Sequence, residues 1–163
     1  MVFVDGAVMN RNASGAAGSG SAHMTLPNAG NGVSGLVQCV HIPGPGIYAV
    51  NGWGHGTGTM VTAGDIAELY WEFRKNGGEN CTSGTPNATG THVISNSNSW
   101  TRPATPAYID VTEQDWTNTS SIAVTLVAVE NGASGAPTNA WFDGVTLGVA
   151  GDDTIFANGF DPP

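Results

Sequence analysis

Apolar and polar side chains alternate along several short stretches of the chain, with glycine, proline and asparagine between the stretches. The clearest stretch is 66–74, whose residues fall into an apolar and a polar set: Ala67, Leu69, Trp71 and Phe73, against Glu68, Tyr70, Glu72 and Arg74. Successive side chains of a strand point to opposite faces, so this period of two predicts a strand with one core face and one polar face. A helix is arguable only over 62–74, and the alternation favours the strand.

Seven further segments have the same strand-like character: 22–26, 36–42, 47–53, 92–94, 107–111, 122–129 and 141–147. Short strands at regular spacing, separated by turn residues, are typical of an all-β sandwich or barrel. No repeat and no internal boundary interrupts them. We therefore expect one β-sandwich domain over residues 1–148, followed by a C-terminal tail over 149–163.

Two of the predicted strands together suggest a ligand-binding face. If 47–53 and 66–74 are neighbours in a sheet, the outward side chains of both share one polar surface. Sugars are bound by an aromatic plane together with planar polar side chains. The candidate ligand-binding residues are therefore Asn51, Trp53, Tyr70, Glu72 and Arg74. The alternatives are a packing role for Trp53 and a solvated Glu72–Arg74 ion pair, worth under about 1 kcal/mol.

The charge balance narrows the range of partners. Four basic residues stand against 13 acidic ones, a net charge of −9. A nucleic-acid backbone or an anionic membrane would be repelled, so we expect neither as a partner, whereas neutral sugars and divalent cations are compatible. The chain also lacks a nucleophile elbow, a phosphate-binding loop and a His-Glu-x-x-His motif, which favours a non-catalytic protein.

The order and spacing of four segments resemble the carbohydrate-binding modules of families 4 and 9. The segments are Gly18-Ser19-Gly20-Ser21-Ala22, Leu36-Val37-Gln38-Cys39-Val40, Gly46-Ile47-Tyr48 and Trp141-Phe142-Asp143-Gly144-Val145-Thr146-Leu147. The resemblance spans residues 18–148 and implies a jelly-roll β-sandwich of two antiparallel sheets. It also implies the function of such modules in bacterial extracellular proteins, which is non-catalytic binding of a poly- or oligosaccharide.

The resemblance also predicts roles for the two cysteines and for one aspartate. The residues alone leave two alternatives for Cys39 and Cys81, a structural disulfide or two buried thiols. Bacterial relatives carry a cysteine pair at these places, which implies the disulfide and agrees with a secreted protein. Relatives hold a structural calcium with help from an acidic residue of an opening Asn-x-x-Phe-Glu strand, which nothing in residues 1–17 matches. The candidate calcium ligand here is Asp143 of the closing motif, in which Gly144 stands where a second aspartate is common.

Two other functions stay open from the sequence. One is a jelly-roll polysaccharide hydrolase or lyase, supported by analogy of fold alone. The other is a self-associating extracellular structural or adhesive protein. In that case residues 2–4 or 155–156 would fill an open sheet edge of another copy, and the alternative is that both ends fold back on their own domain.

Overall fold

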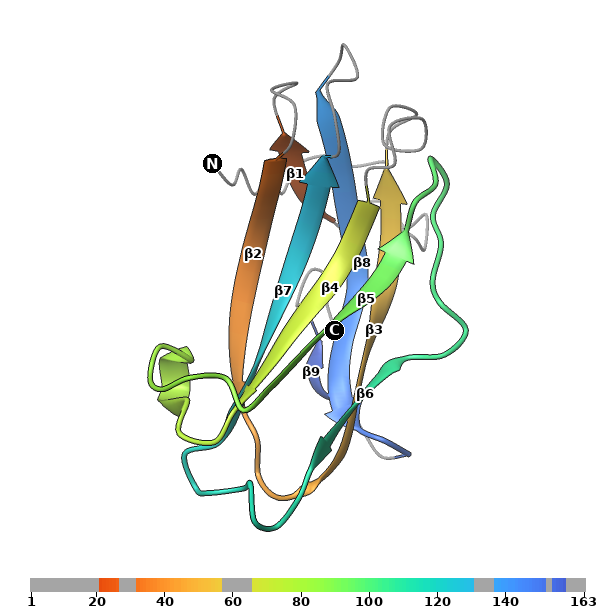
Figure 1. Cartoon of the computed structure of the whole chain (residues 1–163). Helices are drawn as coiled ribbons and strands as arrows, with labels where there is room; N and C mark the ends of the chain where they lie inside the picture. Colours follow the sequence, from red (N-terminus) through yellow and green to blue (C-terminus); the bar gives the residue numbers. More distant parts are fainter. Residues whose placement is uncertain (1–20, 27–31, 57–65, 131–136, 152–153, 158–163) are drawn as a thin grey trace.

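The computed structural model describes residues 21–26, 32–56, 66–130, 137–151 and 154–157, and they form two antiparallel sheets packed face to face (Figure 1). The first sheet contains β1 (Ala22–Leu26), β8 (Thr138–Val149), β3 (Gly46–Gly56) and β6 (Ala107–Val111) in that order, with β9 (Thr154–Ala157) beside β8. The second contains β2 (Gly32–His41), β7 (Ser121–Glu130), β4 (Ile66–Arg74) and β5 (Ala88–Ser95). A short 3₁₀ turn, η1 (Gly78–Asn80), follows β4.

The strand pairing is nested. β1 pairs with β8, β2 with β7, β3 with β6 and β4 with β5, each antiparallel. The pairs β3–β8 and β4–β7 then join these hairpin-like pairs into two sheets. A chain folded back on itself in this way and wound into two sheets is a jelly roll, which confirms the predicted fold class.

The core lies between the sheets and is built from the inward side chains of both. Its largest fully buried members include Tyr48, Phe73, Phe142, Met24, Ile42, Leu69, Ile109, Ile122 and Leu147. Burying an apolar side chain of this size contributes roughly 1.5–3 kcal/mol, so these contacts dominate the stability of the sandwich. In β4 the predicted alternation is confirmed, with Ala67, Leu69 and Phe73 buried and Trp71 packed against the same core.

All eight predicted strands are present, most of them longer than expected. The strand β9 was not predicted; it lies in the range expected to be a tail and pairs with β8 over Thr146–Gly148. Residues 2–4, proposed as an edge-filling segment, lie outside the described residues. Within the described part of the chain, no helix has the length and apolarity to cross a membrane.

Candidate functional site

The predicted composite surface does not form, because its two strands belong to different sheets. Asn51 and Trp53 lie on β3 of the first sheet, whereas Tyr70, Glu72 and Arg74 lie on β4 of the second. The expectation that these strands are neighbours is therefore wrong. The outward faces of β3 and β4 lie on opposite sides of the sandwich, so Trp53 and Tyr70 cannot contact one ligand surface.

A cleft lies on the outer side of the first sheet, around Trp53. It has a volume of about 490 Å³ and is lined by Ala49, Asn51, Trp53, Arg102, Pro103, Ala104, Pro106 and Thr146. β3 and β8 supply its floor, since Asn51 pairs with Thr146 across the two strands. The segment between β5 and β6 supplies its wall. This volume falls in the range of small-molecule sites, about 300–1,000 Å³.

A β-bulge positions Trp53 on the floor. Asn51 pairs with Thr146 but Trp53 pairs with Asp143, so β8 carries one residue more than β3 over this stretch. Gly144 takes up the extra residue with a positive φ of 52°, and a Cβ there would lie 3.3 Å from the Trp53 ring. Bulges of this kind redirect neighbouring side chains. The glycine in the closing motif is thus explained by backbone conformation and by its contact with the indole.

Hydrogen bonds fasten the wall of the cleft to β3. Thr101 and Gly54 exchange two backbone hydrogen bonds of 2.9 Å, and the Thr101 hydroxyl donates to the Ile94 carbonyl at 2.8 Å. The Asn51 amide nitrogen donates to the carbonyl of Pro103 at 3.0 Å, and its oxygen accepts from the backbone N–H of Gly52 at 2.8 Å. Asn51, a predicted ligand-binding residue, therefore holds the segment that carries Arg102.

Aromatic and imidazole rings form a row beside the cleft, across β1, β8 and β3. His23 stacks on Trp141 with ring centroids 4.6 Å apart, and His55 meets the edge of Trp141 at 5.0 Å. His55 also contacts Trp100, just before the wall segment, at 5.5 Å. Trp141 is only 5% exposed, so it supports the other rings rather than offering a face of its own.

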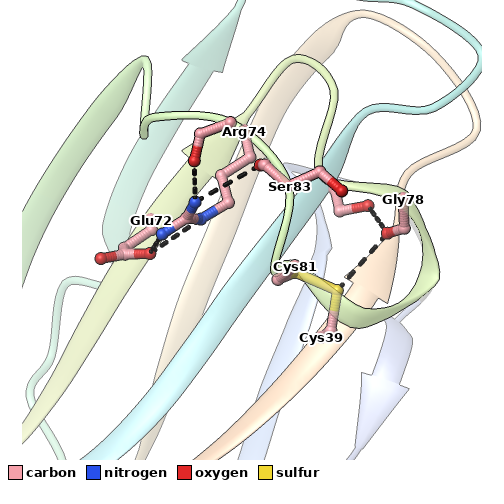
Figure 2. The surroundings of a disulfide bond; sticks show 8 residues. Cys39, Glu72, Arg74, Gly78, Cys81 and Ser83 are labelled. Atoms are coloured by element: carbon pink, nitrogen blue, oxygen red, sulfur yellow. Dashed lines mark hydrogen bonds and ion pairs between the residues drawn. A yellow bond between two sulfur atoms is a disulfide. The ribbon is translucent and has the colours of Figure 1, made fainter.

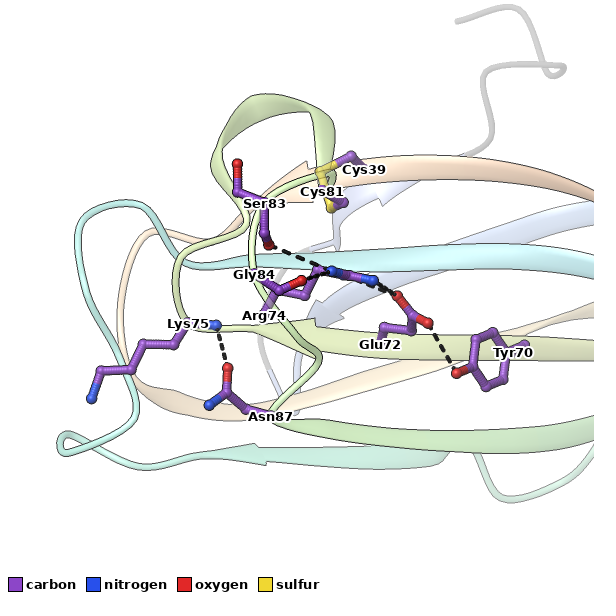
Figure 3. A network of polar contacts seen from close by, with 9 residues as sticks. All are labelled: Cys39, Tyr70, Glu72, Arg74, Lys75, Cys81, Ser83, Gly84 and Asn87. Atoms are coloured by element: carbon purple, nitrogen blue, oxygen red, sulfur yellow. Dashed lines mark hydrogen bonds and ion pairs between the residues drawn. A yellow bond between two sulfur atoms is a disulfide. The ribbon is translucent and has the colours of Figure 1, made fainter.

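The other predicted residues form a polar network on the outer face of the second sheet (Figure 3). The Tyr70 hydroxyl donates to Glu72 at 3.0 Å, and the Arg74 guanidinium forms an ion pair with Glu72 at 2.6 Å. Arg74 also donates to the Gly84 carbonyl at 2.5 Å. Burial, together with the hydrogen bond to Glu72 and its negative charge, raises the pKa of Tyr70. These side chains satisfy one another's hydrogen-bonding groups. Glu72 and Arg74 therefore form an ion pair, which was the alternative to ligand binding.

Next to this network, Cys39 of β2 and Cys81 form the predicted disulfide (Figure 2). Sγ of Cys39 and the hydroxyl of Ser121 both lie against the carbonyl of Gly78. The connection from β4 to β5 therefore runs away from β5, passes β7 and is tied to β2. The disulfide is confirmed, and it belongs to the structure of the second sheet rather than to the cleft.

The calcium prediction concerns the first sheet. Asp143 is 2% exposed and its Oδ1 accepts the backbone N–H of Gly144 at 2.8 Å. Among the described residues, no group of three or more histidine, cysteine, aspartate or glutamate side chains is placed to hold a metal ion. The side chains around Asp143 therefore do not make a calcium site by themselves, and calcium binding stays a prediction.

Of the polar residues that line the cleft, Asn51 and Trp53 were predicted from the sequence, whereas Arg102 and Thr146 were not. Arg102 is the last basic residue of the chain and stands in the run Trp100-Thr101-Arg102-Pro103. A lone cation beside a tryptophan and a proline, far from any other basic residue, was the available signal. The pairing of Gly54 with Thr101, which brings it to Trp53, has no local sequence signature.

The sequence matches no protein-family model and no curated protein. Solved structures that are similar in fold include the following two. TmCBM61 in complex with β-1,4-galactotriose has 18% identity, with 79% of this chain and 70% of that chain covered and a TM-score of 0.45. Family 16 Carbohydrate Binding Module-2 has 15% identity, with 82% and 80% covered and a TM-score of 0.47. The resemblance to families 4 and 9 stays a prediction, and the ligand is inferred below from this chain's own geometry.

Proposed function

We propose that this protein is a non-catalytic extracellular module that binds a poly- or oligosaccharide in the Trp53 cleft. The observation that carries the proposal is the cleft itself, where a half-buried indole, a guanidinium and a hydroxyl line one surface of the first sheet. An indole plane covers the apolar face of a pyranose, and polar groups around it bind the hydroxyls. The disulfide supports an extracellular location, because such bonds persist in oxidising compartments.

The chemistry of the cleft favours binding over turnover. Glycoside hydrolysis in most families requires two carboxyl groups flanking the scissile bond. The described residues lining the cleft include no aspartate or glutamate. Glu72, the acid among the residues predicted from the sequence to bind the ligand, lies on the opposite sheet and is paired with Arg74.

The test is retention on a polysaccharide panel in affinity gels, followed by calorimetry with oligosaccharides of any glycan retained. We expect Trp53→Ala to abolish retention and Tyr70→Ala to leave it unchanged, because the tyrosine lies on the opposite face. Unfolding curves of both variants serve as the folding control. No retention of the wild-type chain on any glycan would refute the proposal, and loss with Tyr70→Ala alone would move the site to the second sheet.

Self-association is a second candidate function, in which β9 of one copy would pair with β8 of another instead of with β8 of its own chain. This strand pairs with β8 beyond the point where β1 ends, so β1 and β9 follow each other along the same edge. The same segment of another copy would fit that edge equally well, as in exchanged-strand assemblies.

A further inference from the structure

We infer that the ligand of the Trp53 cleft is an acidic sugar, whose carboxylate binds Arg102. This inference rests on the proposed function and specifies its ligand class. It starts from the polar groups that line the cleft. They belong to Asn51, Trp53, Arg102 and Thr146, and the remaining lining residues are alanine and proline.

The lining side chains are rich in donors. The indole N–H and the guanidinium can only donate, and a hydroxyl can do either. Asn51 has the one lining side-chain amide, and both its oxygen and its nitrogen are engaged with Gly52 and Pro103. No carboxylate of a described residue lines the cleft to accept hydrogen bonds from a neutral sugar's hydroxyls. A ligand that brings its own strong acceptor complements this set best.

Among the basic residues that the structure describes, Arg102 is the one whose side chain makes no hydrogen bond or ion pair. Arg74 binds Glu72 and Gly84, and the Lys75 ammonium donates to the Gln114 carbonyl. Within the described ranges, Arg102 makes no side-chain hydrogen bond or ion pair, and it is exposed. Arg11 lies outside the described residues. In a chain of net charge −9, one free guanidinium at the mouth of a cleft is a specific feature rather than part of a general basic surface.

The backbone on both sides of Arg102 is held in place. Thr101 is paired with Gly54, and the Pro103 carbonyl accepts from Asn51. This anchoring lowers the entropy cost of binding, because the backbone that carries the Arg102 side chain is already ordered before the ligand binds. A guanidinium binds a carboxylate through two parallel hydrogen bonds, a geometry that an ammonium cannot reproduce.

The negative charge around the cleft favours a ligand with few acidic groups. Asp143 lies on the same face as Trp53, and the whole chain repels anions at long range. A densely charged polyanion is therefore disfavoured, and a single uronic acid within an otherwise neutral oligosaccharide fits better. A sulfate ester would present a similar charge with a different shape, so the experiment separates the two.

The experiment uses an array of uronic-acid oligosaccharides, each beside its carboxyl-reduced neutral counterpart, with sulfated neutral oligosaccharides as a third arm. Binding is measured by calorimetry for the full chain and for Arg102→Gln, Arg102→Lys and Trp53→Ala. We expect at least one acidic oligosaccharide to bind tenfold or more tightly than its reduced form. Arg102→Gln should remove this difference while keeping the weaker affinity for the reduced form, and Arg102→Lys should keep only part of it.

The contrary outcomes distinguish the acidic-sugar inference from the proposal that the cleft binds carbohydrate. If reduced forms bind as well as acidic ones, or if the preference survives in Arg102→Gln, the acidic-sugar inference is wrong and carbohydrate binding stands. A preference for sulfated over uronic-acid sugars overturns the assignment of a carboxylate. If nothing on the array binds, the acidic-sugar inference is wrong, and retention on the polysaccharide panel decides whether carbohydrate binding stands.

Discussion

At the scale of single residues, the conformation of Gly144 and the position of Trp53 depend on each other. The glycine has a φ of 52°, and its α-carbon faces the Trp53 ring. Residues with a side chain adopt this left-handed conformation at a cost of roughly 1–2 kcal/mol. Glycine is therefore favoured at position 144 for two reasons: the positive φ of the backbone and the close approach of the Trp53 ring.

We expect Gly144→Ala to lower both the free energy of unfolding and the affinity for the ligand, because the added methyl must displace the indole. Gly84→Ala is the matched control, since Gly84 has a φ of 70° and open space where a Cβ would lie. Both should lose roughly 1–2 kcal/mol of stability in urea unfolding, but only Gly144→Ala should weaken glycan binding. Equal affinity of the two variants would show that the bulge does not position Trp53.

A histidine at the edge of the second sheet makes stability depend on pH. Burial lowers the pKa of His92 below its ordinary value of 6.5, and its Nε2 has no hydrogen-bond partner. The unfolded chain then binds a proton before the folded one does, so stability falls as the pH drops from 6.5 toward the lowered pKa. We expect His92→Gln to reduce this loss in urea unfolding between pH 7 and pH 5.

The exposed residue His41 supplies the comparison for that measurement. His41→Gln reports what replacing a histidine does where no burial is involved. If wild type and His92→Gln lose stability in parallel over this range, the neutral form of His92 contributes nothing and the prediction is wrong.

At the scale of elements, the connection from β4 to β5 is longer than the pairing of these two adjacent strands requires, and a disulfide ties it to β2. The two strands are adjacent, yet the chain between them detours past β7 to reach β2. Arg74 holds one part of it through the Gly84 carbonyl, and Cys81 holds another. The disulfide closes a loop with a sequence separation of 42, for which the chain-entropy estimate is about 4 kcal/mol.

We expect the double variant Cys39→Ala/Cys81→Ala to lose up to about 4 kcal/mol of unfolding free energy, measured in urea. Its affinity for the glycan should be unchanged, because the disulfide lies on the sheet opposite the cleft. Arg74→Gln, which breaks only the polar network, should cost less. A fall in glycan affinity without a fall in stability would contradict the separation of the two faces.

At the scale of the whole molecule, the described part of the chain covers the edge of β8 beyond β1 with the strand β9. β9 pairs with Thr146–Gly148 of β8, so the C-terminal segment completes the first sheet. An unpaired strand edge is a template for another chain. Whether β9 comes from the same copy decides between a binding module and a self-associating protein.

We expect light scattering to give the mass of one chain for the full protein and a mass that rises with concentration after truncation at Ala150. The reason is that truncation leaves the β8 edge unpaired. A dimer of the full protein that becomes monomeric on truncation would instead mean that β9 is exchanged between copies. That result would favour self-association as the function.

The sequence by itself determined the strands and the faces of their side chains. In 66–74 the period of two separates Ala67, Leu69 and Phe73 from Glu68 and Tyr70, and the structure follows it. Such a pattern is local, because the geometry of one strand decides which way each side chain points. The resemblance carried by the order of motifs implied the jelly roll and the pairing of two cysteines with a sequence separation of 42.

Only the tertiary structure decided which strands are neighbours, and with that the composition of the site. In a jelly roll, strands far apart in the chain pair, as β3 does with β8, while consecutive strands such as β3 and β4 enter different sheets. A periodic pattern contains no information about partners, since any strand with an apolar face can cover the same core. The prediction that Trp53 shares a surface with Tyr70 was therefore wrong. Long-range strand pairing places Arg102 and Thr146 in the lining of the same cleft as Trp53 instead.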